Sequence, residues 1–99
     1  MHAEHFNLIE TLNRMWDQFS REKDRRNLVH IALSAYTLAK GVLHRDSANQ
    51  CDSLFGKLME RSDYRDAYRM MAAISADRNI SKYQRLLLGD RPVPVVMMK

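Results

Sequence analysis

Four histidines and one cysteine are the side chains of this 99-residue sequence best suited to hold a metal or act as a nucleophile. His2 and His5 stand three residues apart with Glu4 between them, a spacing that could place two ligands on one helical face. A structural zinc site needs four ligands, mostly Cys and His, and no third ligand follows at a predictable place. We therefore predict no metal site and no cofactor.

The other residues with catalytic potential fall at positions expected to be structural. His30 lies in an apolar helical segment, His44 lies at a turn, and Cys51 lies on a face expected to be buried. A buried thiol of this kind packs as a small hydrophobic group. The three glycines, at positions 41, 56 and 89, are isolated, so no glycine-rich phosphate loop is present. These observations predict that the protein is not an enzyme.

Basic side chains are concentrated in two segments. The net charge is +4, and residues 21–45 and 77–99 are strongly basic, whereas residues 1–20 and 46–76 are slightly acidic. Such segments favour contact with phosphate or with an acidic protein surface. The candidate contacts for an anionic partner are Arg21, Lys23, Arg25, Arg26, Lys82, Arg85 and Arg91. A further basic series, Lys57, Arg61, Arg65 and Arg69, is interleaved with carboxylates and is interpreted as an internally paired surface.

Apolar residues recur every three or four positions along almost the whole chain, which is the period of an amphipathic helix. The pattern predicts helices over residues 6–19 and 28–42, the second capped by Asp24 and central to the bundle. A third is expected to start at the capping box of residues 47–50, a fourth at Ser62 or Asp63, and a short fifth at Ser81. Asn79 is expected to end the fourth helix, and Gly89 the fifth. The fold class is therefore all-α, an antiparallel bundle of four helices plus a short fifth, forming one domain over residues 1–90.

Residues 91–99, RPVPVVMMK, are predicted to form an extended apolar tail. Pro92 and Pro94 fix two φ angles and favour extended conformations in the residues before them. Such a segment can add to a sheet edge or fill a groove. It either covers its own helices or is a partner-binding segment, whose residues are Pro92, Val93, Pro94, Val95, Val96, Met97 and Met98.

Two stretches resemble known families. Residues 54–74, LFGKLMERSDYRDAYRMMAAI, resemble the middle of a tetratricopeptide hairpin, with a small residue at Gly56, a turn at residues 62–64 and a second small residue at Ala67. The resemblance implies one antiparallel helix pair, since no second copy follows at that family's period. Residues 71–92 resemble the helix-turn-helix of lambda-repressor-like DNA-binding domains, which implies an inward Leu86. It also implies that Lys82, Gln84 and Arg85 face the nucleic acid.

The methionines supply the last observation. Met15, Met59 and Met71 fit a small core, whereas Met70, Met97 and Met98 are surplus to the expected inner faces and are typical of adaptable binding surfaces.

With no catalytic group assembled, we predict a cytoplasmic, non-enzymatic accessory protein that binds a larger protein as an adaptor or inhibitor. Phages and mobile elements carry such proteins at this scale. Two alternatives stay open: a nucleic-acid-binding regulator, or a homodimeric helical module rather than a monomer. No membrane association is expected, because the longest charge-free run is far shorter than a ~20-residue span.

Overall fold

The computed structural model describes residues 3–89; the predicted tail, including Arg91, lies outside the described residues. Five helices follow one another: α1 (Ala3–Arg21), α2 (Arg25–Ala39), α3 (Arg45–Arg61), α4 (Tyr64–Ala76) and α5 (Arg78–Leu88). The prediction of an all-α bundle with four helices and a short fifth is confirmed.

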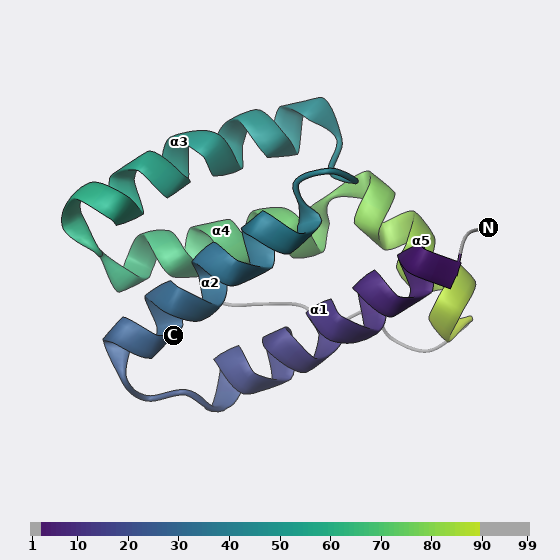
Figure 1. Cartoon of the computed structure of the whole chain (residues 1–99), viewed down its shortest axis with the longest axis horizontal. Helices are drawn as coiled ribbons and strands as arrows, with labels where there is room; N and C mark the ends of the chain where they lie inside the picture. The colour runs from purple at the N-terminus through teal and green to yellow at the C-terminus, as the bar shows by residue number, and fades with distance from the viewer. Residues whose placement is uncertain (1–2, 90–99) are drawn as a thin grey trace.

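The first four helices reverse direction at each turn, so α2 and α4 run side by side in the same direction (Figure 1). Their N-termini therefore lie at the same end of the molecule. α2 packs against α1 and α4, α3 packs mainly against α4, and α5 turns back to meet α1. The prediction that α2 is the central helix is only partly right, because α4 packs against α2, α3 and α5 and shares the central position.

Small residues allow the close packing of this core. Ala32, Ala35 and Ala39 on α2 and Ala67 on α4 are fully buried. A side chain that ends at Cβ lets neighbouring backbones approach, and larger groups from the other helices fill the remaining space. These larger groups are Ile9, Leu12, Phe19, Leu58, Met70, Met71, Ile74 and Ile80, all fully or almost fully buried.

Aspartates begin three of the helices. The Oδ1 atom of Asp24 accepts from the backbone N–H of Arg26 at 2.8 Å, and that of Asp63 accepts from the N–H of Arg65 at 2.9 Å. Each bond satisfies one of the N–H groups that a helix leaves unpaired at its start. The cap at Asp24 is confirmed, and of the two expected caps of α4 the structure uses Asp63. Ser62 instead ends α3, with a left-handed φ of 53°.

The predicted starts of the other two helices are wrong. α3 begins at Arg45, two residues before the expected Ser47 cap, because the Nδ1 atom of His44 accepts from the N–H of Asp46 at 3.2 Å. α5 begins at Arg78 instead of following a cap at Ser81, and Asn79 lies inside it rather than ending α4. In both cases a residue outside the expected capping box supplies the acceptor.

The reason for the early start of α5 is Asp77, which is buried and joins two loops. Its Oδ1 atom accepts from the N–H groups of Asn79 and Ile80, at 2.9 and 3.1 Å, and its Oδ2 atom accepts from the N–H of His44 at 3.0 Å. The side-chain amide of Asn79 donates to the Val42 carbonyl at 3.1 Å. We call these residues (Val42, His44, Asp77 and Asn79) the Asp77 junction.

Candidate functional site

Three adjoining hollows follow the surface between α2 and α3. The central one, about 370 Å³, is lined by Val29, Leu33, Leu58 and Met59 among others. It shares Leu33 with a hollow of about 540 Å³ farther along α2, and Arg25 and Ser62 with one of about 490 Å³ at the turn between α3 and α4. Together they form the α2–α3 groove. Its lining residues are Arg25, Arg26, Val29, His30, Leu33, Ser34, Thr37, Leu38, Phe55, Leu58, Met59, Arg61, Ser62, Asp63, Tyr64 and Arg65.

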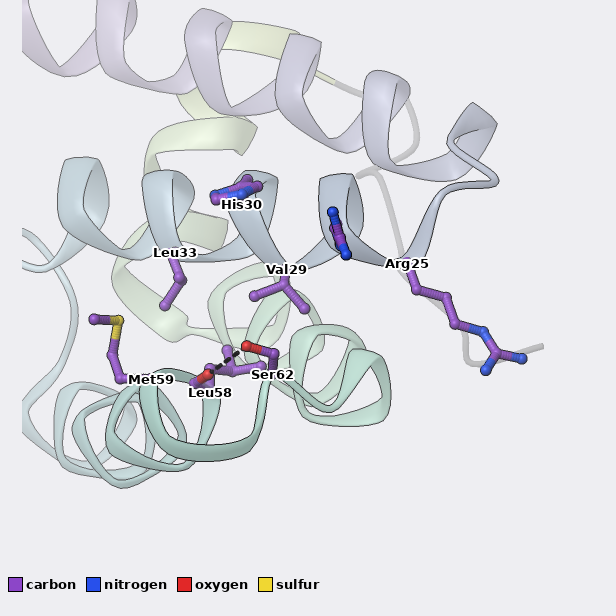
Figure 2. Close-up of a pocket in the computed structure, with 8 residues that line it drawn as sticks. Arg25, Val29, His30, Leu33, Leu58, Met59 and Ser62 are labelled. Atoms are coloured by element: carbon purple, nitrogen blue, oxygen red, sulfur yellow. Dashed lines mark hydrogen bonds between the residues drawn. The ribbon is translucent and has the colours of Figure 1, made fainter.

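The groove exists because α2 and α3 both pack on α4 and have few contacts with each other. Where they do meet, the Tyr36 and Phe55 ring centroids lie 6.0 Å apart, and the Tyr36 hydroxyl donates to the Asp52 carboxylate. Figure 2 shows Val29 and Leu33 pointing from α2 toward α3, where Leu58 and Met59 lie. The groove floor is therefore apolar and built by both helices.

Exposed apolar side chains are concentrated at this groove. Among the described residues, the large hydrophobic side chains left exposed are Met59 (65%), Leu86 (55%) and Leu38 (42%). Met59 and Leu38 line the groove, whereas Leu86 lies on α5. An exposed apolar set on a concave surface is typical of a binding site.

This distribution corrects two predictions about the methionines. Met59, expected in the core, is exposed, and Met70, expected to be surplus, is fully buried. The reason is that α4 packs against α2, α3 and α5, so its buried face is wider than one stripe. α3 packs mainly on α4 and leaves the Met59 side uncovered.

One end of the groove is basic. The guanidinium of Arg25 lies 4.5 Å from the centre of the Tyr64 ring, a cation–π contact that joins the first turns of α2 and α4. Arg61 and Arg65 reach the same hollow from the turn between α3 and α4. Within residues 3–89, Arg25 and Arg26 form no ion pair, whereas Arg65 pairs with Asp63 at 3.0 Å.

A buried carboxylate forms ion pairs with two arginines near this basic end. Asp66 on α4 has a 2% exposed side chain and pairs with Arg69 Nη1 at 2.7 Å and Arg61 Nη2 at 3.8 Å. The interpretation of this basic series as internally paired is thus confirmed for Arg61, Arg65 and Arg69, whereas Lys57 forms no ion pair within residues 3–89. Burial leaves the carboxylate few alternative partners, so Asp66 restrains the two arginines near the α3–α4 turn.

The structure separates the two predicted basic segments. Arg21 pairs with Asp17 at 3.3 Å near the end of α1, and Lys23, Arg25 and Arg26 follow it. Lys82 and Arg85 lie exposed on α5, which packs near the start of α1, where the His5 and Tyr83 rings are 4.4 Å apart. The length of α1 from His5 to Arg21 is about 24 Å. Within the described residues, Lys82 and Arg85 therefore do not share a surface with Arg21, Lys23, Arg25 and Arg26.

The helix-turn-helix resemblance is wrong at two positions. Gln84, expected to face nucleic acid, is fully buried and donates from Nε2 to the Asn13 Oδ1 atom at 3.2 Å. Leu86, expected on the inner face, is exposed. α5 is thus oriented by its packing on α1, with Lys82 and Arg85 outside.

The side chains with nucleophilic potential are held in their protonated forms. Burial, with the nearby Asp52 carboxylate, raises the pKa of the Cys51 thiol to about 11. Burial, with the hydrogen bond to Asp52, raises the pKa of the Tyr36 hydroxyl to about 12. In residues 3–89, no three His, Cys, Asp or Glu side chains are grouped so that they could hold a metal ion.

Sequence reasoning missed the groove itself. Met59 was expected in the core, because helical periodicity gives an apolar stripe but not the number of helices that cover it. One signal was available: Phe55 and Met59 lie four residues apart, one position beyond Leu54 and Leu58, and so widen the stripe at one edge.

Comparisons with family models, curated proteins and solved structures found no match to this chain. No helix between residues 3 and 89 is long and apolar enough to cross a membrane.

Proposed function

We propose that this chain is a non-enzymatic accessory protein that binds a larger protein partner through the α2–α3 groove and so acts as an adaptor or inhibitor. The observation that carries the proposal is the exposure of Met59 and Leu38 on a concave apolar surface. Leaving these side chains in water forgoes about 25 cal/mol for each Å² that a partner could cover.

The chemistry of the groove supports binding rather than catalysis. Its floor is formed by Val29, Leu33 and Leu58. The polar side chains around the floor are mainly arginines and hydroxyls, together with the exposed imidazole of His30. The hydroxyls of Thr37 and Ser62 donate to backbone carbonyls one turn earlier. Methionine and leucine at a rim adapt to the shape of an incoming apolar side chain. Cys51 and Tyr36, with their raised pKa values, are buried away from the groove surface.

A protein partner is favoured over duplex nucleic acid by the placement of the basic residues. A duplex presents phosphates along its whole length and selects for a continuous basic surface. Here Arg25 and Arg26 border an apolar floor, and Lys82 and Arg85 lie near the other end of α1. Each basic segment alone is small for a nucleic-acid interface.

Photo-crosslinking in the native cell tests the proposal. Residue 59 is replaced by p-benzoylphenylalanine in the full-length protein, and residue 86 by the same amino acid as a matched control. Both positions are exposed and apolar in the native chain. We expect a discrete crosslinked protein from position 59 and a much weaker one, or none, from position 86.

The outcome that contradicts the proposal is an equal set of crosslinks from both positions, which would mean that apolar exposure alone causes capture. Crosslinking to nucleic acid at position 59 would support the regulator alternative instead. Crosslinking of position 59 to a second copy of this chain would support the homodimer alternative.

A further inference from the structure

We infer that the occupant of the α2–α3 groove is an amphipathic helix of the partner that carries acidic residues toward one end. This inference rests on the proposed function and specifies the chemistry of the segment that binds. Three features of the groove lead to it: its shape, the distribution of apolar groups and the distribution of charge.

The shape fits a helix. Two helices, α2 and α3, form the walls, and their shared contact with α4 lies beneath them. The lining runs along α2 from Arg25 to Leu38, a length of about 20 Å, or roughly 13 residues of a partner helix. A helix lying on two others buries an apolar stripe whose residues recur at every third or fourth position.

The apolar groups are distributed along that length on both walls. Leu33 and Leu38 come from α2, and Phe55 and Met59 come from α3. Charged residues are absent from the lining at the Leu38 end, where the remaining groups are the hydroxyl side chains Ser34 and Thr37. This end accepts the apolar stripe of a helix but offers no ionic contact.

Charge is confined to the other end of the groove. Four arginines, Arg25, Arg26, Arg61 and Arg65, line it, and Asp63 and Asp66 pair with the last two. Asp24, next in sequence to Arg25, is engaged with the backbone N–H groups of Arg26 and Asn27.

The start of α2 adds to the positive potential at this end. Arg25 and Arg26 occupy the first turn of α2, where the helix dipole already disfavours positive charge. An acidic residue on the partner would relieve this local repulsion.

The chain's own tail is a poor match for such an occupant. Residues 91–99 contain Arg91 and Lys99 and no acidic residue, so their charge has the same sign as the basic end. Their two prolines also disfavour a helix. Charge complementarity therefore favours an acidic segment of another protein.

Binding of four synthetic peptides to the full-length protein, measured by fluorescence anisotropy, tests the inference. The first is a 14-residue helix former with leucines at helical spacing and three glutamates in its last two turns. The second has glutamines in place of the glutamates, the third has a central proline, and the fourth is residues 90–99 of this chain. We expect the glutamate peptide to bind at least about ten-fold more tightly than the other three, equivalent to 1.4 kcal/mol.

Matched variants locate the effect. Arg26→Gln should abolish most of the preference for glutamate over glutamine, and Arg85→Gln on α5 should leave it unchanged. The preference should also weaken as salt rises, because the charges involved are exposed. Met59→Glu should weaken binding of both the glutamate and the glutamine peptide.

Three results would overturn the inference: equal binding of the glutamate and glutamine peptides, tight binding of the proline peptide, or displacement of the glutamate peptide by residues 90–99. Light scattering that gave twice the 11.6 kDa chain mass, reduced to one chain by Met59→Glu, would also overturn it. Each of the first two results leaves crosslinking at position 59 unaffected. Failure of this inference is therefore distinguishable from failure of the proposed function.

Discussion

The Asp77 junction and the α2–α3 groove differ in how their side chains find partners. At the junction, one buried carboxylate accepts three backbone N–H groups, two from the first turn of α5 and one from the loop before α3, and Asn79 donates to a carbonyl of the same loop. At the groove, Met59 and Leu38 are large apolar side chains that the described part of the chain leaves exposed. The polar groups of the junction are hydrogen-bonded within the chain, whereas apolar side chains of the groove are exposed to solvent.

This difference separates the residues that stabilise the fold from those available for binding. A buried, fully hydrogen-bonded carboxylate is costly to disturb, because each orphaned donor loses its partner away from water. An exposed apolar side chain costs little to replace in the free protein, since its environment is already solvent. The comparison therefore predicts large effects on stability at the junction and small ones at the groove.

Asp77→Ala should have the largest effect on folding. The substitution removes the α5 cap and the link to the loop before α3, so we expect a loss of about 3 kcal/mol in the free energy of unfolding. Urea denaturation followed by circular dichroism measures it. Asp77→Asn, which keeps an acceptor for the cap, should lose less, and a loss below 1 kcal/mol in Asp77→Ala would show that the junction does not hold the loops together.

Ala35→Leu should be the next most damaging change. Ala35 is fully buried on α2, and added methyl groups have no space there, so a loss of about 2 kcal/mol is expected. Ser34→Leu, one residue earlier at the edge of the groove, is the matched control and should change stability by less than about 0.5 kcal/mol. Equal losses in both variants would contradict the conclusion that Ala35 lies on the buried face of α2 and Ser34 on its exposed face.

Alkaline pH should weaken the contact between α2 and α3 where Tyr36 meets Phe55 and Asp52. The pKa of Tyr36 is raised to about 12 in the folded chain against about 10 when unfolded, so its stabilising contribution is complete below pH 10 and is lost as the pH rises toward 12. We expect a smaller effect than that of either substitution above. The urea midpoint of Tyr36→Phe should fall less between pH 9 and 11 than that of the native chain. Equal declines would show that the protonated Tyr36 hydroxyl does not stabilise the folded chain.

Met59→Glu and Leu38→Glu should have the smallest effect on stability. Both side chains are exposed on helices, and glutamate is a good helix former, so the free energy of unfolding should change by less than about 0.5 kcal/mol. Thermal melts monitored by circular dichroism measure this change. A loss of 2 kcal/mol or more in either variant would show that the groove side chains belong to the core.

Local chemistry explains which parts of the fold could be predicted from the sequence. Helical periodicity predicted the number of helices. Short-range hydrogen bonding predicted the cap at Asp24 and placed the cap of α4 at either Ser62 or Asp63, of which the structure uses Asp63. The start of α5 could not be predicted in this way. Asp77 is buried partly through its bond to the N–H of His44, 33 residues earlier in the chain.

The candidate site was harder to predict than the fold for a related reason. Met59 and Met70 have the same side chain and both lie near helical apolar stripes, yet one is exposed and the other buried. What separates them is the number of helices that pack on α3 and α4. That number depends on the arrangement of all five helices. The basic end of the groove likewise joins Arg25 and Arg26 to Arg61 and Arg65 through the parallel alignment of α2 and α4.

The capture of the partner from the native cell by Met59→Glu and by Leu86→Glu tests the central claim most directly. Both variants place one glutamate at an exposed apolar position, one inside the groove and one on α5. The quantity measured is the amount of the partner, identified beforehand by crosslinking at position 59, that co-purifies with each variant. We predict that Met59→Glu lowers this amount by about ten-fold or more, a loss typical of a central interface residue. Leu86→Glu should leave it within two-fold. Equal yields from the two variants would contradict the assignment of the α2–α3 groove as the binding surface.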